Sequence, residues 1–79
     1  MKSYTYRIII EPDGKSLHGY VPALVGCHTF GKTIAETKKN LREAIELYLE
    51  TLVSEKETIP DDLSFESFET ISLDRKIYA

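Results

Sequence analysis

The sequence predicts an α+β domain in which one long helix packs on a small antiparallel sheet, in the order β-β-β-α-β. Residues 4–30 hold three short segments that are rich in β-branched and aromatic residues and are separated by turn signals. Residues 34–53 change to the three-and-four spacing of an amphipathic helix. Residues 65–73 return to strand composition. With 79 residues in total, residues 1–79 are expected to form a single domain with a thin core.

The first two strands are expected to form a hairpin. The first runs from Tyr4 to Ile10 and ends on three isoleucines, so both of its faces are apolar, as in a strand that is covered on both sides. Glu11–Gly14 is a turn signal, since proline fixes φ and glycine accepts a positive φ. The second strand, Leu17–Val21, follows so closely that it must return beside the first.

The third strand lies between two glycines. Pro22 ends the second strand, and Pro22–Gly26 is the next predicted turn. Cys27–Phe30 is the third strand, and Gly31 breaks it. Gly26 and Gly31 are interpreted as turn residues that need a positive φ.

The helix has a clear start signal. Thr33 is the predicted N-cap, and Glu36 stands three residues later, which together make a capping box. Pro60 prevents continuation, so the helix is expected to fray between Ser54 and Glu57. The apolar positions that define its face are Ile34, Leu41, Ala44, Ile45, Tyr48, Leu49 and Leu52.

The helix is longer than the predicted strands. A helix of about 22 residues spans roughly 33 Å, whereas strands of this length span about 17–23 Å. Leu52 and Val53 therefore overhang the sheet and need a cover, either the returning C-terminal segment or a second subunit. Together with the thin core, this predicts a homo-oligomer, a dimer or higher.

A fourth strand is predicted over Phe65–Leu73, where Glu69–Leu73 alternates between polar and apolar residues. The connecting loop, Lys56–Ser64, is long enough for this strand to pair with the first.

Composition narrows the function class. The formal net charge is −3 and no basic stripe is present, which argues against direct nucleic-acid binding. No apolar run is long enough for a signal peptide or a membrane span. The single cysteine permits no internal disulfide, which fits a reducing cytoplasm. The sequence thus predicts a cytoplasmic protein that does not contact membranes.

Cys27 and His28 suggest a catalytic or metal-binding pair at first sight. Neighbours on a strand point to opposite faces, so these two side chains cannot pair with each other, although His18 on the adjacent strand can approach one of them. Cys27 is interpreted as a small buried apolar residue. The spacing of the histidines and the cysteine matches no metal-ligand pattern, so neither a metal nor a cofactor is expected.

Acidic residues gather late in the chain. Glu43, Glu46 and Glu50 share one helix face, which is either a solvated face or a surface for a basic partner. Residues 55–74 contain seven acids and one lysine, a local charge of −6. A field of this sign steers basic partners.

Three stretches, RIIIEPDG, GYVPALVGCHTFGKT and AETKKNLREAIELYLE, resemble the HicB-type antitoxin family over residues 6 to 60. The order and spacing of the matching positions carry the resemblance more than any single motif does. The signature positions are Pro22, Gly26, Cys27, Gly31, Thr33 and Glu36, with Ala44 and the Glu46–Glu50 run on the helix.

The resemblance implies a truncated ribonuclease-H-like fold without nuclease activity. It also implies a partner, a small basic HicA-type toxin that cleaves mRNA, which the antitoxin neutralises by covering it. Many relatives add a C-terminal DNA-binding module, and 79 residues leave no room for one, so a short form is expected. The alternatives are an orphan protein-binding adaptor of the same fold and, less favoured, a small nuclease or a thiol hydrolase using Cys27.

Overall fold

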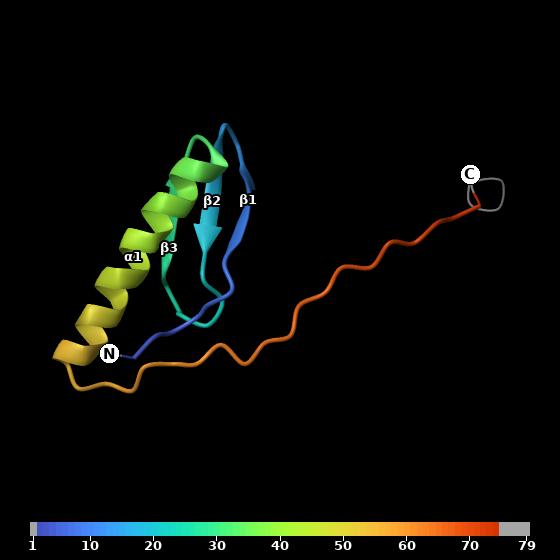
Figure 1. The fold of residues 1–79 in the computed structure, drawn as a ribbon. Coiled ribbons are helices and arrows are strands. Elements are labelled where there is room, and N and C mark those ends of the chain that lie inside the picture. The colour runs from blue at the N-terminus through green and yellow to red at the C-terminus, as the bar shows by residue number, and fades with distance from the viewer. Residues whose placement is uncertain (1, 75–79) are drawn as a thin grey trace.

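The computed structural model describes residues 2–74 and confirms the α+β arrangement (Figure 1). Three strands, β1 (Ile9–Asp13), β2 (Ser16–Tyr20) and β3 (His28–Gly31), form one antiparallel sheet in the order β1-β2-β3. The helix α1 (Ile34–Ser54) follows and packs across one face of the sheet, mainly over β3 and β2.

The first hairpin turns later than the sequence predicted. β1 includes Glu11 and Pro12, which were expected in the turn, and the loop is only Gly14 and Lys15. Gly14 has a φ of 63°, the left-handed conformation that a tight two-residue loop needs at its first position. Pro12 is tolerated because β1 is an edge strand, where a missing N–H leaves no ladder bond unmade.

The core is small and lies between the sheet, the turn after β2 and the helix. Leu41 of α1 is fully buried, and it meets Val21, Leu24 and Cys27 from the segment after β2. The half-buried side chains that surround this cluster are Tyr6, Ile8, Ala44, Ile45, Tyr48 and Leu49. Within residues 2–74, no helix covers the opposite face of the sheet (Figure 1).

The two glycines that flank β3 have different roles. Gly26 has a φ of 81°, which confirms the predicted turn glycine. Gly31 does not have a positive φ, so the reason given for it from the sequence is wrong. A β-carbon on Gly31 would lie 2.8 Å from the Thr37 backbone nitrogen and 3.0 Å from its Cα. Gly31 is therefore required for close approach of β3 to the first turn of α1.

Both helix ends are capped by local hydrogen bonds. The Glu36 N–H donates to Thr33 Oγ1 at 3.0 Å, which confirms the predicted N-cap, while the Glu36 carboxylate accepts from Lys32 N at 3.4 Å. At the C-terminus, Lys56 N donates to Val53 O and Glu57 N donates to Leu52 O. These two bonds form a Schellman motif, whose left-handed position is Lys56, with a φ of 57°.

Replacing Lys56 by glycine is expected to raise the free energy of unfolding by about 0.5–1 kcal/mol. A side chain in the left-handed region crowds its own backbone, and glycine removes that cost. Urea denaturation followed by circular dichroism measures the change. Lys56→Ala is the control, because it removes the charged side chain but keeps the β-carbon; an equal gain in both variants would assign the effect to the charge.

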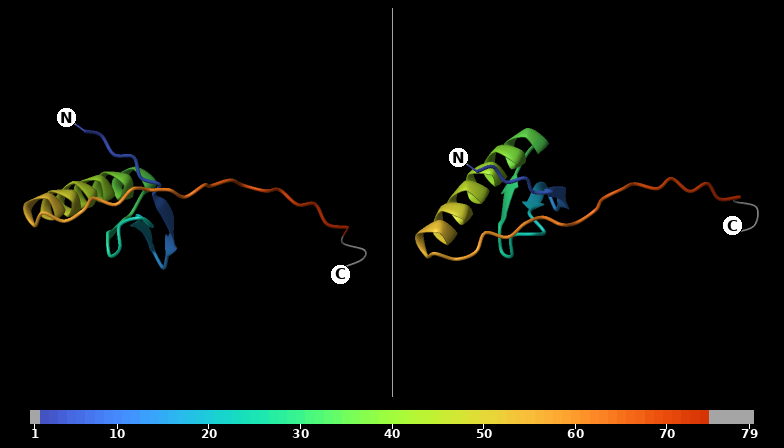
Figure 2. Two further views of the ribbon diagram at one scale, coloured as in Figure 1. Left: turned by 90° about the horizontal axis from the view of Figure 1, so that it is seen from below. Right: turned by 60° about the horizontal axis from the view of Figure 1, so that its bottom comes forward.

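The predicted fourth strand is wrong for the single chain. Residues 57–74 contain no strand; the first part returns beside the body, and the later part extends away from it (Figures 1 and 2). The alternating pattern suits a strand, but the segment lies along no sheet edge within the described part of the chain. A strand needs a neighbour to satisfy its backbone groups, and the pattern alone does not provide one.

Candidate partner-binding surfaces

The predicted acidic surface is a real feature of the helix. Glu43, Glu46 and Glu50 are all exposed on α1, on the side of the helix that does not face the sheet. The last turn of α1 contains no basic residue, so the negative end of the helix dipole adds to the field of Glu50, the nearest of the three. One charge is partly compensated, since Arg42 Nε lies 3.4 Å from Glu46 Oε1. This pair is highly exposed, and such pairs contribute little to stability.

Cys27 is placed for packing. It is 4% exposed in the core, and its N–H donates to Leu24 O while its carbonyl accepts from Val21 N. Burial raises the pKa of its thiol, which keeps it protonated and makes it a weaker nucleophile. His28 is exposed on the opposite side, which confirms that the two neighbours do not form a pair.

The two histidines come together on the open face of the sheet. His18 Nε2 and His28 Nδ1 are 3.3 Å apart, as their positions on adjacent strands allowed. Tyr20 stacks on His18 with ring centroids 5.5 Å apart, and Phe30 lies 4.9 Å from the same ring. Sequence reasoning missed Tyr20 and Phe30. The available signal was the alternation of His-x-Tyr on β2 and His-x-Phe on β3, which places all four rings on one face.

These residues do not make a metal centre in the structure described. Among residues 2–74, no three histidine, cysteine, aspartate or glutamate side chains converge in a group that would hold a metal ion. Within the same range, no helix is long and apolar enough to cross a membrane.

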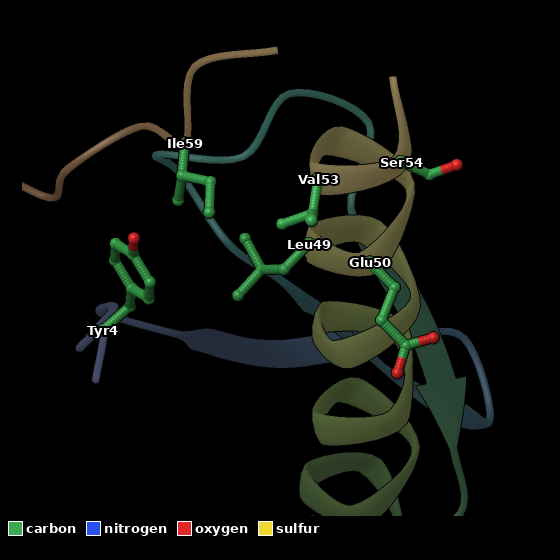
Figure 3. Close-up of a pocket in the computed structure, with 6 residues that line it drawn as sticks. All are labelled: Tyr4, Leu49, Glu50, Val53, Ser54 and Ile59. Carbon is green, nitrogen blue, oxygen red and sulfur yellow. The ribbon is translucent and has the colours of Figure 1, made fainter. Parts of the chain in front are cut away.

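An apolar hollow lies beside the C-terminal half of α1 (Figure 3). Leu49 and Val53 point from the helix toward Tyr4 and Ile59, while the Glu50 carboxylate points away. Val53 is 62% exposed, so the predicted overhang is present there, whereas Leu52 is half-buried. Ile59 of the returning chain supplies only a partial cover.

The returning chain is anchored near the start of β1. The Tyr6 hydroxyl donates to Pro60 O at 2.7 Å, and Arg7 N donates to Asp62 Oδ2 at 2.7 Å. Arg7 Nη1 also lies 3.8 Å from Glu66 Oε1. These contacts, which no sequence pattern revealed, hold residues 60–66 across the lead into β1.

Replacing Asp62 by alanine is expected to release this anchor. The hydrogen bonds from the backbone of Arg7 and then Ser64 lower the pKa of Asp62 below its usual value of 3.8. The anchor is therefore complete above that value and is lost as the pH falls through the lower folded pKa. Hydrogen exchange at the Arg7 amide, expressed relative to the rate of an unfolded chain at the same pH, should accelerate several-fold in Asp62→Ala and in wild type at low pH. Asp61→Ala is the matched control; acceleration in that variant to the same degree would contradict the assignment.

The signature positions of the sequence fall on the turn after β2 and on the start of the helix. Gly26 and Cys27 shape the turn, Gly31 admits the helix, and Thr33 with Glu36 caps it. Pro22 follows the buried Val21 and begins the turn. They lie along the connection that runs from β2 through β3 into the helix.

Comparison with known proteins agrees with this pattern. Residues 6–74 match the family described as HicB_like antitoxin of bacterial toxin-antitoxin system. A UPF0150 protein of Synechocystis is 41% identical over 61 residues, covering 75% of this chain and 76% of that protein. A UPF0150 protein of Thermoplasma acidophilum is 46% identical over 59 residues, covering 75% of this chain and 84% of that protein. No solved structure matches the chain significantly. Since the family match spans most of the chain, from the lead into β1 to the extended C-terminal segment, the chain belongs to the HicB-like antitoxin family.

Proposed function

We propose that this chain is the antitoxin of a type II toxin–antitoxin system and that it neutralises a small basic HicA-type toxin that cleaves mRNA. The observation that carries the proposal is the family match over residues 6–74. The toxin is blocked by occlusion, because the antitoxin covers the surface that would otherwise contact RNA. Such a role requires a binding surface and no catalytic group. The antitoxin and the toxin act in the cytoplasm, where mRNA is translated.

The surface proposed for the toxin is the outer face of α1 with Glu43, Glu46 and Glu50. Three carboxylates within two turns of one helix, near its negative end, create a local field that attracts lysine and arginine side chains. The seven acids of residues 55–74 extend the same field beyond the helix. A toxin that binds RNA has the complementary charge, since neutralising phosphates requires basic residues.

The surroundings of Cys27 and of the acidic side chains favour a catalytic role less. Cys27 is buried with a raised thiol pKa, the opposite of an activated nucleophile. Among residues 2–74, the acids of α1 and of the segment after it form no group of three that would hold a metal ion. The three-stranded sheet with one helix is compatible with a truncated ribonuclease-H-like fold that serves as a scaffold for binding.

Co-purification with the product of the adjacent small reading frame tests the proposal. The two proteins are co-expressed with an affinity tag on this chain, and the complex is washed at increasing salt. A basic neighbour should be retained at low salt and released progressively at high salt, because screening weakens the attraction between exposed charges. A neighbour that is neither basic nor retained would contradict the proposal.

A further inference from the structure

The C-terminal segment is an unusual feature of the isolated chain. Five large apolar side chains in residues 63–73 are 65–91% exposed, namely Leu63, Phe65, Phe68, Ile71 and Leu73. From residue 67 to residue 73, the described structure gives the segment no hydrogen bond or ion pair. The radius of gyration is 16.9 Å, whereas 79 compact residues would give about 12 Å. An exposed apolar segment of this size indicates a surface that is covered by a partner.

The segment has the pattern of a strand with one buried face. Ile71 and Leu73 share one parity and Thr70 and Ser72 the other, so Thr70–Leu73 alternates between polar and apolar residues. Upstream the alternation is irregular, because Ser67 and Glu69 fall on the parity of Ile71. Glu69–Leu73 has five residues, the same length as β1. The segment therefore has the pattern and the length of a missing neighbour of β1.

The acceptor is present in the same chain. β1 pairs with β2 on one side and has no strand on the other within residues 2–74. The opposite edge of the sheet is partly occupied, because Asn40 Nδ2 donates to Phe30 O of β3 at 2.9 Å. Pro12 offers no N–H to a neighbour on this side, so the part of the unpaired edge that can template another strand is the apolar start of β1, Ile9 and Ile10. β1 is thus the edge that accepts one.

The anchor directs the segment away from its own β1. Asp62 already accepts from Arg7 N, and Glu66 lies against the Arg7 side chain, so residues 60–66 cross the lead into β1. The chain then leaves the body, as two further views agree (Figure 2). Each copy therefore holds a free strand and a free edge that do not meet within it. A second copy supplies both, and the exchange closes as a two-fold dimer.

We propose that two copies of this chain exchange their C-terminal segments, so that Glu69–Leu73 of each adds as a fourth strand to the β1 edge of the other. Ile71 and Leu73 then face the helix-covered side, next to the apolar residues of β1. Residues 67 and 68 bridge the copies. The exchange completes a four-stranded sheet without using Glu43, Glu46 and Glu50 of α1.

Two pairs of substitutions in the full chain test the proposal. Ile71→Asp with Leu73→Asp places charge on the face that is buried in the exchange. Thr70→Asp with Ser72→Asp adds the same charge at neighbouring positions on the other face. Light scattering after size exclusion should give twice the chain mass for wild type and for the Thr70/Ser72 variant. The Ile71/Leu73 variant should dissociate into monomers at a protein concentration at least tenfold higher than wild type does. Its far-UV circular dichroism spectrum, which reports the helix, should stay unchanged. A monomeric wild type, or an equal effect of both pairs, would overturn the proposal.

Hydrogen exchange of the wild-type chain identifies which segment occupies the free edge of β1. Exchange between copies predicts that amides of residues 69–73 and of β1 become protected together as the protein concentration rises. Protection that is independent of concentration would show that the segment folds back on its own sheet. Protection that appears only when the toxin is added would show that the toxin is the partner. Either of the last two results would overturn the strand exchange.

Discussion

Replacing Gly31 by alanine should lower the free energy of unfolding by about 3 kcal/mol. The new β-carbon would stand 2.8 Å from the Thr37 backbone nitrogen and against the Thr37 hydroxyl oxygen. Thr37 is fully buried, and its hydroxyl donates to Thr33 O at 2.7 Å, so neither the side chain nor the backbone is free to move aside. Forcing an extra carbon into such a contact costs about 1–3 kcal/mol and occasionally more. A domain of this size has on the order of 5 kcal/mol in total.

Urea denaturation of Gly31→Ala measures this loss, and Gly14→Ala is its control. Gly14 has a φ of 63° and nothing within 4 Å of the position of a β-carbon. Its replacement costs only the strain of the left-handed conformation, about 1 kcal/mol. Equal losses in the two variants would contradict the close-approach role assigned to Gly31.

Reversing the charge of the helix face should slow association with the toxin by tenfold or more. Glu43→Lys, Glu46→Lys and Glu50→Lys together change the formal net charge from −3 to +3, since each substitution adds two charges. Long-range attraction becomes repulsion, and steering acts mainly on the association rate. Stopped-flow mixing at low salt measures that rate. The dissociation rate should change less, because exposed charges contribute more to encounter than to the bound complex.

A charge-matched variant separates local from global effects. Glu11→Lys and Asp13→Lys together with Ser3→Lys and Thr5→Lys add the same six charges at exposed positions outside α1 and outside residues 55–74. A local binding surface predicts a clearly smaller effect from this control. The same slowing in both variants would show that net charge, and not this helix face, governs the encounter.

Local signals in the sequence predicted local structure well. Thr33 caps the helix because its hydroxyl accepts a hydrogen bond from Glu36 N, only three residues further along. This contact forms whenever the first turn is helical, so no distant segment is needed for it. Cys27 is buried and His28 is exposed, as the strand period predicted, although β3 begins only at His28. The first strand was predicted over Tyr4–Ile10, but β1 spans Ile9–Asp13, because the pairing register with β2, and not the Pro-Gly signal, fixes where the strand begins and where the hairpin turns.

Features that depend on contacts between distant segments were not predictable. The packing of Gly31 on Thr37 depends on how the helix crosses the sheet, and the anchor of Asp62 on Arg7 joins residues 55 positions apart. The period of residues 65–73 indicates a strand, but sequence cannot tell whether its neighbour lies in the same chain. The exposed positions of Glu43, Glu46 and Glu50 followed from helical spacing, whereas their role as a toxin-binding surface stays a prediction.

Titration of this chain into an RNA-cleavage reaction tests the antitoxin role most directly. The enzyme is the purified product of the adjacent reading frame, and the measured quantity is the initial rate of cleavage of a defined mRNA. The rate should fall in proportion to the added chain and reach zero at a fixed stoichiometric ratio, and the Glu43/Glu46/Glu50 charge-reversed variant should inhibit only at higher concentration. Cleavage that continues unchanged at saturating concentrations of the wild-type chain would contradict neutralisation of that toxin.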